Sequence, residues 1–348
     1  MHDSMFHRMP RWSRIRAGKT RTTAHFPSAS ATVLTILVTA CTVGVLGPGP
    51  AAADPVRLPG TVDIPCAGGT LNQSADWYLP SGQPRGLVWV QHGFARSNDN
   101  VAALAETLST AGYLVFAPSL PFLNLDGCTL QNLGSNTPFL DHIADLFATA
   151  ADPTGVLAQS LAAAATHAGR PIPEMPGLLA FIGHSAGAEA VEYVAHRLHS
   201  TYPTTWQNLR GLVLLDPVKS FLGDNTDRAL TDLDATDLPV LAVSGPPSLC
   251  NNFGSGTTAL QTLLHRPFLG VRLPAGEHTD AEGTSSDALG ELLCGVPQAG
   301  NVDAVQRLTT GWTDDFFTGA RTTGYYPDDV RAPGLVCAMP GAQPLPAT

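Results

Sequence analysis

Charged side chains are scarce in this sequence, and positive ones are the scarcer kind. Only 14% of the 348 residues are charged, with 19 Lys and Arg against 29 Asp and Glu, for a formal net charge of −10. This acidic surplus gives no electrostatic attraction for the phosphates of nucleic acids or for an anionic membrane surface. We therefore expect neither as a partner.

The signatures of a metal site are missing as well. The chain has no Cys-x-x-Cys pair and no group of Cys and His residues with the spacing of a zinc site. Its densest group of acids (Asp224, Asp227, Asp232 and Asp234) lacks the glycine and the terminal glutamate of a calcium loop. We expect these acids to form a solvated loop, and we expect no metal.

A long hydrophobic run is the third absence. The longest apolar stretch, residues 31–46, is interrupted by threonines and Cys41, so it is too short and broken to span a membrane comfortably. It follows a segment with six basic residues and one acid, and it precedes Ala51-Ala52-Ala53. This order is typical of a secretory signal peptide over residues 1–53. We expect cleavage after Ala53 and a secreted protein of residues 54–348 with a net charge of −15.

The same region offers a second processing site. Val38-Thr39-Ala40-Cys41 is similar to a bacterial lipobox. Lipidation of Cys41 would anchor the protein at the outer face of the cell membrane instead of releasing it. We expect contact with a membrane only in that case.

Five cysteines follow the expected cleavage site: Cys66, Cys128, Cys250, Cys294 and Cys337. An exported protein meets oxidising conditions, so some of them should form disulfides. Because Cys250 and Cys294 both follow late strands of the expected sheet, we favour a bridge between them. The other pairings stay open, and the odd count leaves one cysteine over.

Beyond residue 54, short runs rich in Val and Leu alternate with stretches of helical periodicity. We expect strands over residues 76–79, 86–91, 113–117, 178–182, 212–215, 240–243 and 269–273. We expect helices over residues 101–111, 139–150, 156–167, 186–198, 259–265, 287–294 and 302–320. Such alternation predicts an α/β fold: a doubly wound, mostly parallel sheet with helices on both faces. We expect a single domain over residues 54–348, with a loop at 118–136 and an irregular tail from about residue 322.

One strand-to-helix junction carries the pattern of a catalytic serine. The apolar run 178–182 leads into Gly183-His184-Ser185-Ala186-Gly187, and a helical stretch follows. Gly-x-Ser-x-Gly in this context is typical of a nucleophile elbow, where the serine takes strained backbone angles and the glycines leave room for the turn. We expect Ser185 to be the nucleophile; the alternative is an ordinary serine in a glycine-rich turn.

A nucleophilic serine needs a histidine base, which in this architecture comes last in the chain. His265 and His278 are the two histidines late enough to qualify. His265 is expected at the end of a helix, exposed to solvent. His278 lies in a loop after the last of the expected strands, from which its ring can reach the serine, so we expect His278 to be the base.

The acid that orients the base is expected on the strand after the elbow helix. Asp216 ends the apolar run 212–215, where open α/β sheets place their sites. The later loop 244–252, the more usual place for the acid, has no carboxylate. We therefore expect the triad Ser185, Asp216 and His278, with Asp280 as the strongest competitor for the acid.

Two backbone N–H groups should form the oxyanion hole. One belongs to Ala186, directly after the nucleophile. The other lies in the turn after the run 86–91, where Gly93 allows close approach and Phe94 carries the better-placed N–H. The alternative for this second position is a plain strand-to-helix turn.

These motifs resemble those of α/β-hydrolases, in the branch of chlorophyllases, platelet-activating-factor acetylhydrolases and cutinase-like polyesterases. The resemblance rests on His92-Gly93-Phe94, on residues 112–118, on the elbow and on Leu215-Asp216-Pro217-Val218, and it covers most of residues 62–320. It implies a serine hydrolase of carboxylic esters that works through an acyl-enzyme without a cofactor. The chain departs from the pattern at Ala186, where chlorophyllases usually carry Arg and polyesterases a bulky residue.

Substrate and reaction class are expected from the same features. Only about twenty residues separate Pro217 from Asp237, so we expect no large lid and a fairly open cleft that suits short or medium acyl chains, or an ester on a polymer. No obligatory protein partner is expected. A secreted acyltransferase with the same triad, or a non-catalytic surface protein with a relic site, are the alternatives.

Overall fold

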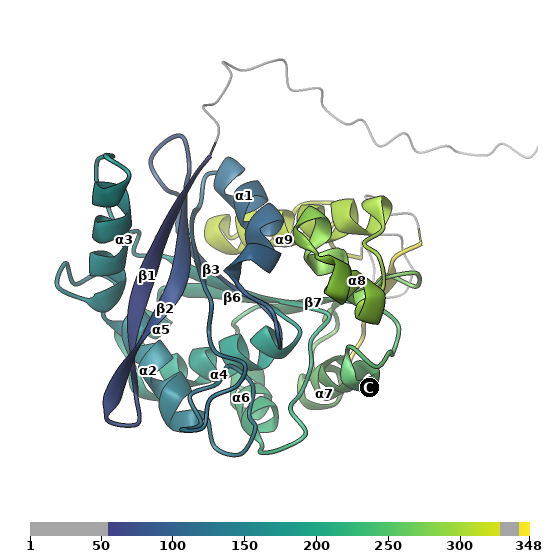
Figure 1. Ribbon diagram of the computed structural model, residues 1–348. Helices are drawn as coiled ribbons and strands as arrows, with labels where there is room; N and C mark the ends of the chain where they lie inside the picture. Colours follow the sequence, from purple (N-terminus) through teal and green to yellow (C-terminus); the bar gives the residue numbers. More distant parts are fainter. Residues whose placement is uncertain (1–54, 328–340) are drawn as a thin grey trace, which may run out of the picture. The chain divides into compact units, whose positions relative to one another are not determined.

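The computed structural model describes residues 55–327 and 341–348. The expected signal peptide, Cys41 and Cys337 lie outside these residues. The described strands form one sheet, in the order β1-β2-β4-β3-β5-β6-β7-β8-β9 (Figure 1). They are β1 (Val56–Cys66), β2 (Gly69–Leu79), β3 (Leu87–Gln91), β4 (Leu114–Pro118), β5 (Leu179–His184), β6 (Leu209–Leu215), β7 (Val240–Ser244), β8 (Gly270–Arg272) and β9 (Gln343–Pro344). Strands β3 to β8 run parallel, and antiparallel strands complete both edges.

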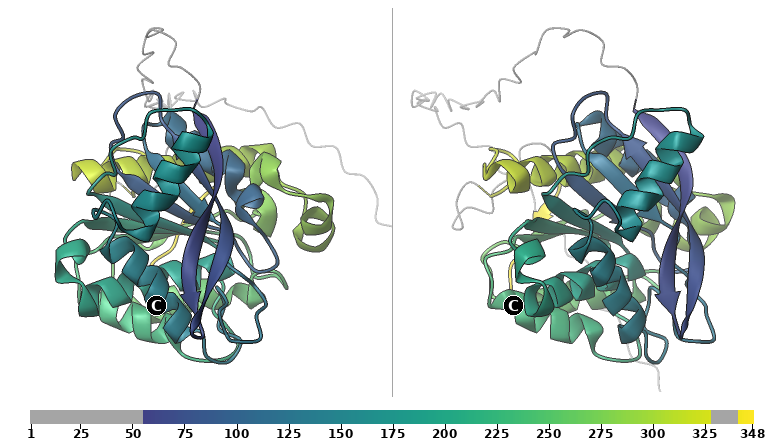
Figure 2. Two further views of the ribbon diagram at one scale, coloured as in Figure 1. Left: turned by 60° about the vertical axis from the view of Figure 1, so that its left-hand side comes forward. Right: turned by 90° about the vertical axis from the view of Figure 1, so that its left-hand side faces the viewer.

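Helices cover both faces of this sheet (Figures 1 and 2). They are α1 (Ala102–Thr110), α2 (Thr137–Ala148), α3 (Val156–His167), α4 (Ala186–Thr201), α5 (Pro203–Trp206), α6 (Asn225–Asp234), α7 (Ser255–Leu263), α8 (Ala288–Cys294) and α9 (Ala299–Thr318). Apolar side chains of α2, α3, α4, α6 and α7 pack against one face. Those of α1 and α9 pack against the other. The expected doubly wound, mostly parallel sheet with helices on both faces is confirmed.

The central strands are apolar throughout because neither of their faces meets solvent. Every residue of β3, β4, β5 and β7 is buried. Successive side chains of a strand point to opposite faces, so Leu87 and Trp89 join one core, while Val88 and Val90 join the other. This two-sided burial gave these strands a clear signal in the sequence.

The edge of the sheet was harder to predict. Strand β1 was not expected, and only the last four residues of β2 were. These strands form a hairpin whose turn, Ala67-Gly68, has positive φ at both residues (46° and 82°), as tight hairpin turns require. Exposed and buried residues alternate along β1, and Pro59 and Pro65 interrupt it, as prolines can in an edge strand. Because polar residues and prolines are mixed with the apolar ones, the sequence of β1 does not show a clear strand pattern.

The expected acidic loop is a helix, so that prediction was wrong. Asp227, Asp232 and Asp234 belong to α6, whose buried residues include Ala229, Leu230 and Leu233. The acids face other elements: Asp227 pairs with Lys219, and Asp232 accepts from His196 and His199 on α4. Residues 119–136 contain no helix or strand, as expected.

Two disulfides fasten loops to neighbouring elements. Cys250–Cys294 joins the loop after β7 to the end of α8, and Cys66–Cys128 joins the end of β1 to the loop after β4. The favoured Cys250–Cys294 pairing is confirmed, and the second pairing was left open by the sequence. No helix within residues 55–327 and 341–348 has both the length and the apolar character needed to cross a membrane.

Candidate active site

Ser185 lies at the tip of a tight turn between β5 and α4. Its backbone angles, φ 56° and ψ −125°, fall in a region that side-chain-bearing residues avoid. A Cβ on Gly183 would lie 2.5 Å from the Gly187 carbonyl oxygen, and one on Gly187 would lie 2.6 Å from that of Gln91. The elbow pattern is thus explained by space: only glycine fits at either position while Ser185 is held at the surface of the turn.

His278 and Asp216 are brought together from the ends of two different strands. Asp216 directly follows β6, and His278 begins the short helix η3 (His278–Ala281) after β8. The His278 Nδ1 atom lies 2.6 Å from Asp216 Oδ2. Because an ionised carboxylate only accepts hydrogen bonds, Nδ1 carries the proton and Nε2 is left with a lone pair. This is the tautomer that a general base requires.

The Asp216 carboxylate is held by the loop after β7, which is the more usual place for the acid of such a triad. The Gly245 N–H donates to Asp216 Oδ1 at 2.9 Å, and the Asn251 side-chain amide lies 3.2 Å from both carboxylate oxygens. The loop after β7 therefore supplies hydrogen-bond donors in place of the acid. Nothing in the sequence pattern identified Asn251 for this role.

Asp280 and His265, the other candidates for the acid and the base, make different contacts. Asp280 accepts the backbone N–H groups of Glu277 and Gln298, each at 2.7 Å, so its carboxylate braces the histidine segment. His265 is exposed, as expected, and pairs with Asp234. Neither is joined to Ser185 or His278 by a hydrogen bond.

The two expected oxyanion donors flank the serine. Ala186 is the first residue of α4, where a backbone N–H has no acceptor within its own helix. The turn with Phe94 passes so close that a Cβ on Gly93 would lie 2.7 Å from Ser185 Cβ. Gly93 is therefore needed for close approach, as the sequence suggested.

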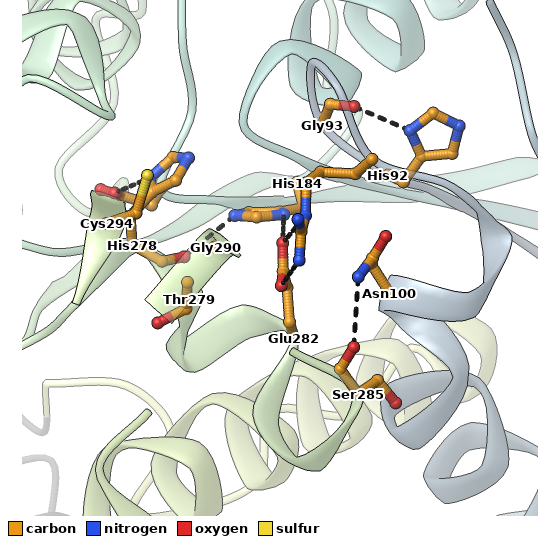
Figure 3. Close-up of polar contacts among 12 residues, drawn as sticks. His92, Gly93, Asn100, His184, His278, Thr279, Glu282, Ser285, Gly290 and Cys294 are labelled. Carbon is orange, nitrogen blue, oxygen red and sulfur yellow. Dashed lines mark hydrogen bonds and ion pairs between the residues drawn. The ribbon is translucent and has the colours of Figure 1, made fainter. Parts of the chain in front are cut away.

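The buried His92 anchors the peptide that carries the Phe94 N–H. Its Nδ1 lies 2.7 Å from the Gly93 carbonyl oxygen (Figure 3), and since a carbonyl only accepts, Nδ1–H is the donor. Burial lowers the pKa of His92 to about 4, so the ring is neutral at physiological pH. In a trans peptide the carbonyl and the next N–H point in opposite directions, so fixing the Gly93 carbonyl also fixes the Phe94 N–H.

A second buried histidine supports the segment that carries His278. His184 precedes Ser185, and its Nε2–H donates to the His278 carbonyl oxygen at 3.0 Å. Burial, together with the neighbouring His278, holds the pKa of His184 well below the ordinary value of 6.5. His184 is therefore neutral, and it joins the elbow directly to the histidine segment.

Ser185 and His278 line a cavity of about 350 Å³. Its apolar wall comes from Phe94, Leu249, Leu289 and Leu293, with the Cys250–Cys294 disulfide beside them. A larger cavity, of about 660 Å³, lies near the start of β7 around Arg266 and Phe268. That cavity contains none of the expected catalytic residues.

Large exposed apolar side chains are concentrated in segments that follow strands of the sheet, and four of them, Phe94, Leu249, Leu289 and Leu293, line the smaller cavity. With the exception of Ile172, the large exposed hydrophobic residues of the described chain follow the carboxyl ends of β3, β4, β6, β7 and β8. They are Phe94, Phe122, Leu123, Leu125, Leu133, Phe221, Leu222, Leu249, Phe253, Leu289, Leu292, Leu293 and Val296. The ring centroids of Phe94 and Phe122 lie 5.3 Å apart in an edge-to-face arrangement, so the loop 119–136 reaches the border of the site through Phe122.

Comparison with solved structures identifies the fold. Brefeldin A esterase, a bacterial homologue of human hormone sensitive lipase, aligns with a TM-score of 0.50 at 11% identity over 78% of this chain and 80% of its own. A Pyrobaculum calidifontis esterase aligns at 0.47 and 14% identity, over 78% of this chain and 88% of its own. Dienelactone hydrolase from Anabaena variabilis aligns with a TM-score of 0.46 at 17% identity, over 75% of this chain and 98% of its own. No family model and no curated protein matches the sequence. The chain has the α/β-hydrolase fold.

Proposed function

We propose that this protein is a serine hydrolase of carboxylic esters, with Ser185 as nucleophile, His278 as base and Asp216 as the acid that orients it. The hydrogen bond from His278 Nδ1 to Asp216 Oδ2, beside a strained Ser185, carries the proposal. This arrangement has a cost, because Asp216 also adopts a positive φ of 40°. Strain at two of three residues is typical of a functional site.

The proposed reaction proceeds in two steps. His278 Nε2 takes the Ser185 hydroxyl proton as Oγ attacks the ester carbonyl carbon, and the resulting oxyanion is stabilised by the N–H groups of Phe94 and Ala186. His278 then protonates the alcohol, which leaves an acyl group on Ser185. Water, deprotonated by His278, attacks the acyl-enzyme and releases the acid. No metal or organic cofactor takes part in these steps.

The lining of the cavity favours an uncharged, apolar ester. Arg96 is the cation at this cavity, and both Glu282 and Asp287 neutralise it. A substrate carboxylate or phosphate would have to compete with these acids, whereas the leucines and Phe94 favour an acyl or alkyl group. The chlorophyllase, acetylhydrolase or polyesterase branch stays a prediction from the sequence motifs.

We further propose that the protein works outside the cell. Two disulfides support this, because such bridges persist in oxidising compartments. Release after Ala53 and lipid anchoring at Cys41 are separated by the mass of the N-terminal peptide of the mature protein.

Replacement of Ser185 tests the proposal. Wild-type protein should hydrolyse 4-nitrophenyl butyrate and should be labelled by a fluorophosphonate probe at Ser185, with the site identified by peptide mass spectrometry. Ser185→Ala should lower kcat by about 10⁴-fold or more. Ser200→Ala, at an exposed position of α4, should leave kcat unchanged.

The outcomes separate the three candidate classes. Absence of both hydrolysis and labelling in folded wild-type protein would indicate a relic site. Transfer of the butyryl group to added glycerol in preference to water would indicate an acyltransferase. Activity that survives in Ser185→Ala would place the nucleophile elsewhere.

A further inference from the structure

A buried ion pair connects the turn of the proposed oxyanion hole with the segment that carries the proposed base. Arg96 lies two residues after Phe94, and Glu282 lies four residues after His278. The Arg96 Nε and Nη2 atoms donate to the two oxygens of Glu282 at 2.7 and 2.6 Å. The side chains are 11% and 2% exposed, respectively. A two-point contact of this kind fixes the direction of approach as well as the distance.

The turn on the Arg96 side needs a restraint. Between Phe94 and Arg96, Ala95 has a φ of 56°, which is unfavourable for a residue with a Cβ. Such a conformation persists only where surrounding contacts hold it in place. His92 holds the beginning of the turn through the Gly93 carbonyl, and Arg96 holds its end.

The segment on the Glu282 side is held to the same region by further contacts. The Asn100 side-chain amide donates to the Ser285 carbonyl oxygen at 3.2 Å, and the Ser285 hydroxyl accepts the Ala103 N–H at 2.8 Å. His184 Nε2–H donates to the His278 carbonyl oxygen at the beginning of this segment. In Figure 3, the Glu282 side chain points from the segment toward His184.

The guanidinium also contacts α8, which forms a wall of the cavity. Arg96 Nη1 lies 3.1 Å from both oxygens of Asp287, the N-cap residue of α8. A Cβ on Gly290 would lie 2.8 Å from Arg96 Nη2, so the helix packs directly on the guanidinium. The turn, the histidine segment and the cavity wall therefore meet at one charged group.

We propose that Glu282 is a positioning residue that, through Arg96, sets the Phe94 N–H at the correct distance and angle from Ser185 and His278. This rests on the proposed ester hydrolysis. Glu282 does not touch the reacting atoms. It acts because the oxyanion donor and the base lie in distant segments of the chain, which the Arg96–Glu282 ion pair joins across 186 residues.

The expected effect follows from where the donor acts. The oxyanion exists only in the transition state and the tetrahedral intermediate, so a displaced Phe94 N–H weakens transition-state binding and leaves ester binding almost unchanged. Displacement of a catalytic group by about 1 Å costs about 100-fold in rate. Glu282→Gln removes the charge and one acceptor, and Arg96→Lys removes the two-point contact.

The test compares these variants by kinetics and by inhibition. Glu282→Gln and Arg96→Lys should each lower kcat for 4-nitrophenyl butyrate by about 10- to 100-fold, with KM changed by less than about twofold. The inhibition constant of a trifluoromethyl ketone, which forms the tetrahedral adduct with Ser185, should rise by the same factor as kcat/KM falls. Asp76→Asn is the matched control, because Asp76 is also a buried partner of an arginine, Arg57, and does not line the cavity.

Loss of stability is separated from loss of position by a double variant. Replacement of a buried ion pair by apolar residues of similar size is often neutral for folding. Arg96→Met/Glu282→Met should therefore unfold near the wild-type temperature and remain slow. Wild-type kcat in folded Glu282→Gln, or in the double variant, would overturn the positioning role. An inactive wild type, or an active Ser185→Ala, would instead overturn the proposed function.

Discussion

The Asp216 carboxylate receives hydrogen bonds from three directions. His278, the Gly245 N–H and the Asn251 amide all donate to it. Its side chain is only 7% exposed, so these donors replace the water that would otherwise solvate its charge. In the proposed reaction this charge would stabilise the imidazolium that forms on His278.

Replacement of this carboxylate by an amide should separate Asp216 from its neighbour in sequence. In Asp216→Asn the side chain can present an N–H to His278, which favours the tautomer with its proton on Nε2, and we expect kcat to fall by up to about 10⁴-fold. Asp280→Asn should keep kcat within about tenfold, because Asp280 braces the backbone and does not contact the His278 ring. A large loss at Asp280 together with near-normal kcat at Asp216 would reverse the assignment.

The positions of single residues were predictable where the fold confines them to a strand end, while their catalytic roles stay a proposal. Ser185, Asp216 and His278 each follow a strand whose apolar run marks it in the sequence, and the expected chain order restricts the choice. Arg96, Glu282 and Asn251 carry no such mark, since isolated polar residues in loops have no periodicity. Their contacts cross 186 residues in one case and 35 in another, so only the folded chain reveals them.

Helices and strands, too, were predictable where an apolar pattern marks them in the sequence. Buried central strands and long amphipathic helices were expected close to their observed places. The strand β1 and the helix α6 were missed because partial exposure dilutes the apolar pattern. The helix α5 and the strand β9 were missed because four and two residues are too few to show a pattern. In α6 the acidic residues dominate the composition, although three apolar residues on one side hold the helix in the core.

Helix α4 carries two buried acids directly after the elbow. Glu189 accepts hydrogen bonds from Ser220, Thr226 and the Asn132 N–H, and so ties the loops 119–136 and 217–224 to the helix. Glu192, one turn further, is 1% exposed, and its Oε2 has no hydrogen-bond partner. Burial and the neighbouring Glu189 raise the pKa of Glu192 well above its ordinary value of 4.5.

The raised pKa of Glu192 should make the stability of the protein depend on pH. Above pH 4.5 the folded state keeps a proton that the unfolded chain has lost, so the free energy of unfolding falls as the pH rises toward the folded-state pKa. Glu192→Gln removes this titration. We expect it to leave stability at pH 4 almost unchanged and to raise the free energy of unfolding at pH 8, where the unfolded chain has lost the proton that the folded state keeps.

Urea denaturation at both pH values measures this difference. Glu106→Gln, at an exposed position of α1, is the matched control and should change stability by less than about 0.5 kcal/mol at either pH. An equal effect of Glu192→Gln at pH 4 and pH 8 would show that Glu192 titrates as an ordinary glutamate.

On the scale of the whole molecule, apolar side chains and an ion-paired cation meet at the cavity that contains Ser185. Phe94, Leu249, Leu289 and Leu293 line it, while Glu282 and Asp287 neutralise Arg96 beside them. The surface that an ester meets next to the serine is therefore mostly apolar. The sequence led us to expect an open cleft for short or medium acyl chains, and the volume and lining of the cavity refine that expectation.

The dependence of activity on acyl length should reflect the size of this cavity. Each methylene group buried against Leu249, Leu289 and Leu293 contributes about 0.8 kcal/mol, or about fourfold in kcat/KM. We expect kcat/KM for 4-nitrophenyl esters to rise from acetyl to about hexanoyl and then to level off, because the cavity of about 350 Å³ is then filled.

Leu293→Ala should flatten the rise, whereas Leu292→Ala should not, since Leu292 lies on the same helix but does not line the cavity. A fall from acetyl onward would show that the acyl chain lies outside the cavity. A continued rise to palmitoyl, with a jump in rate where the substrate forms an emulsion, would show that a mobile cover built from residues 118–136 sets the preference.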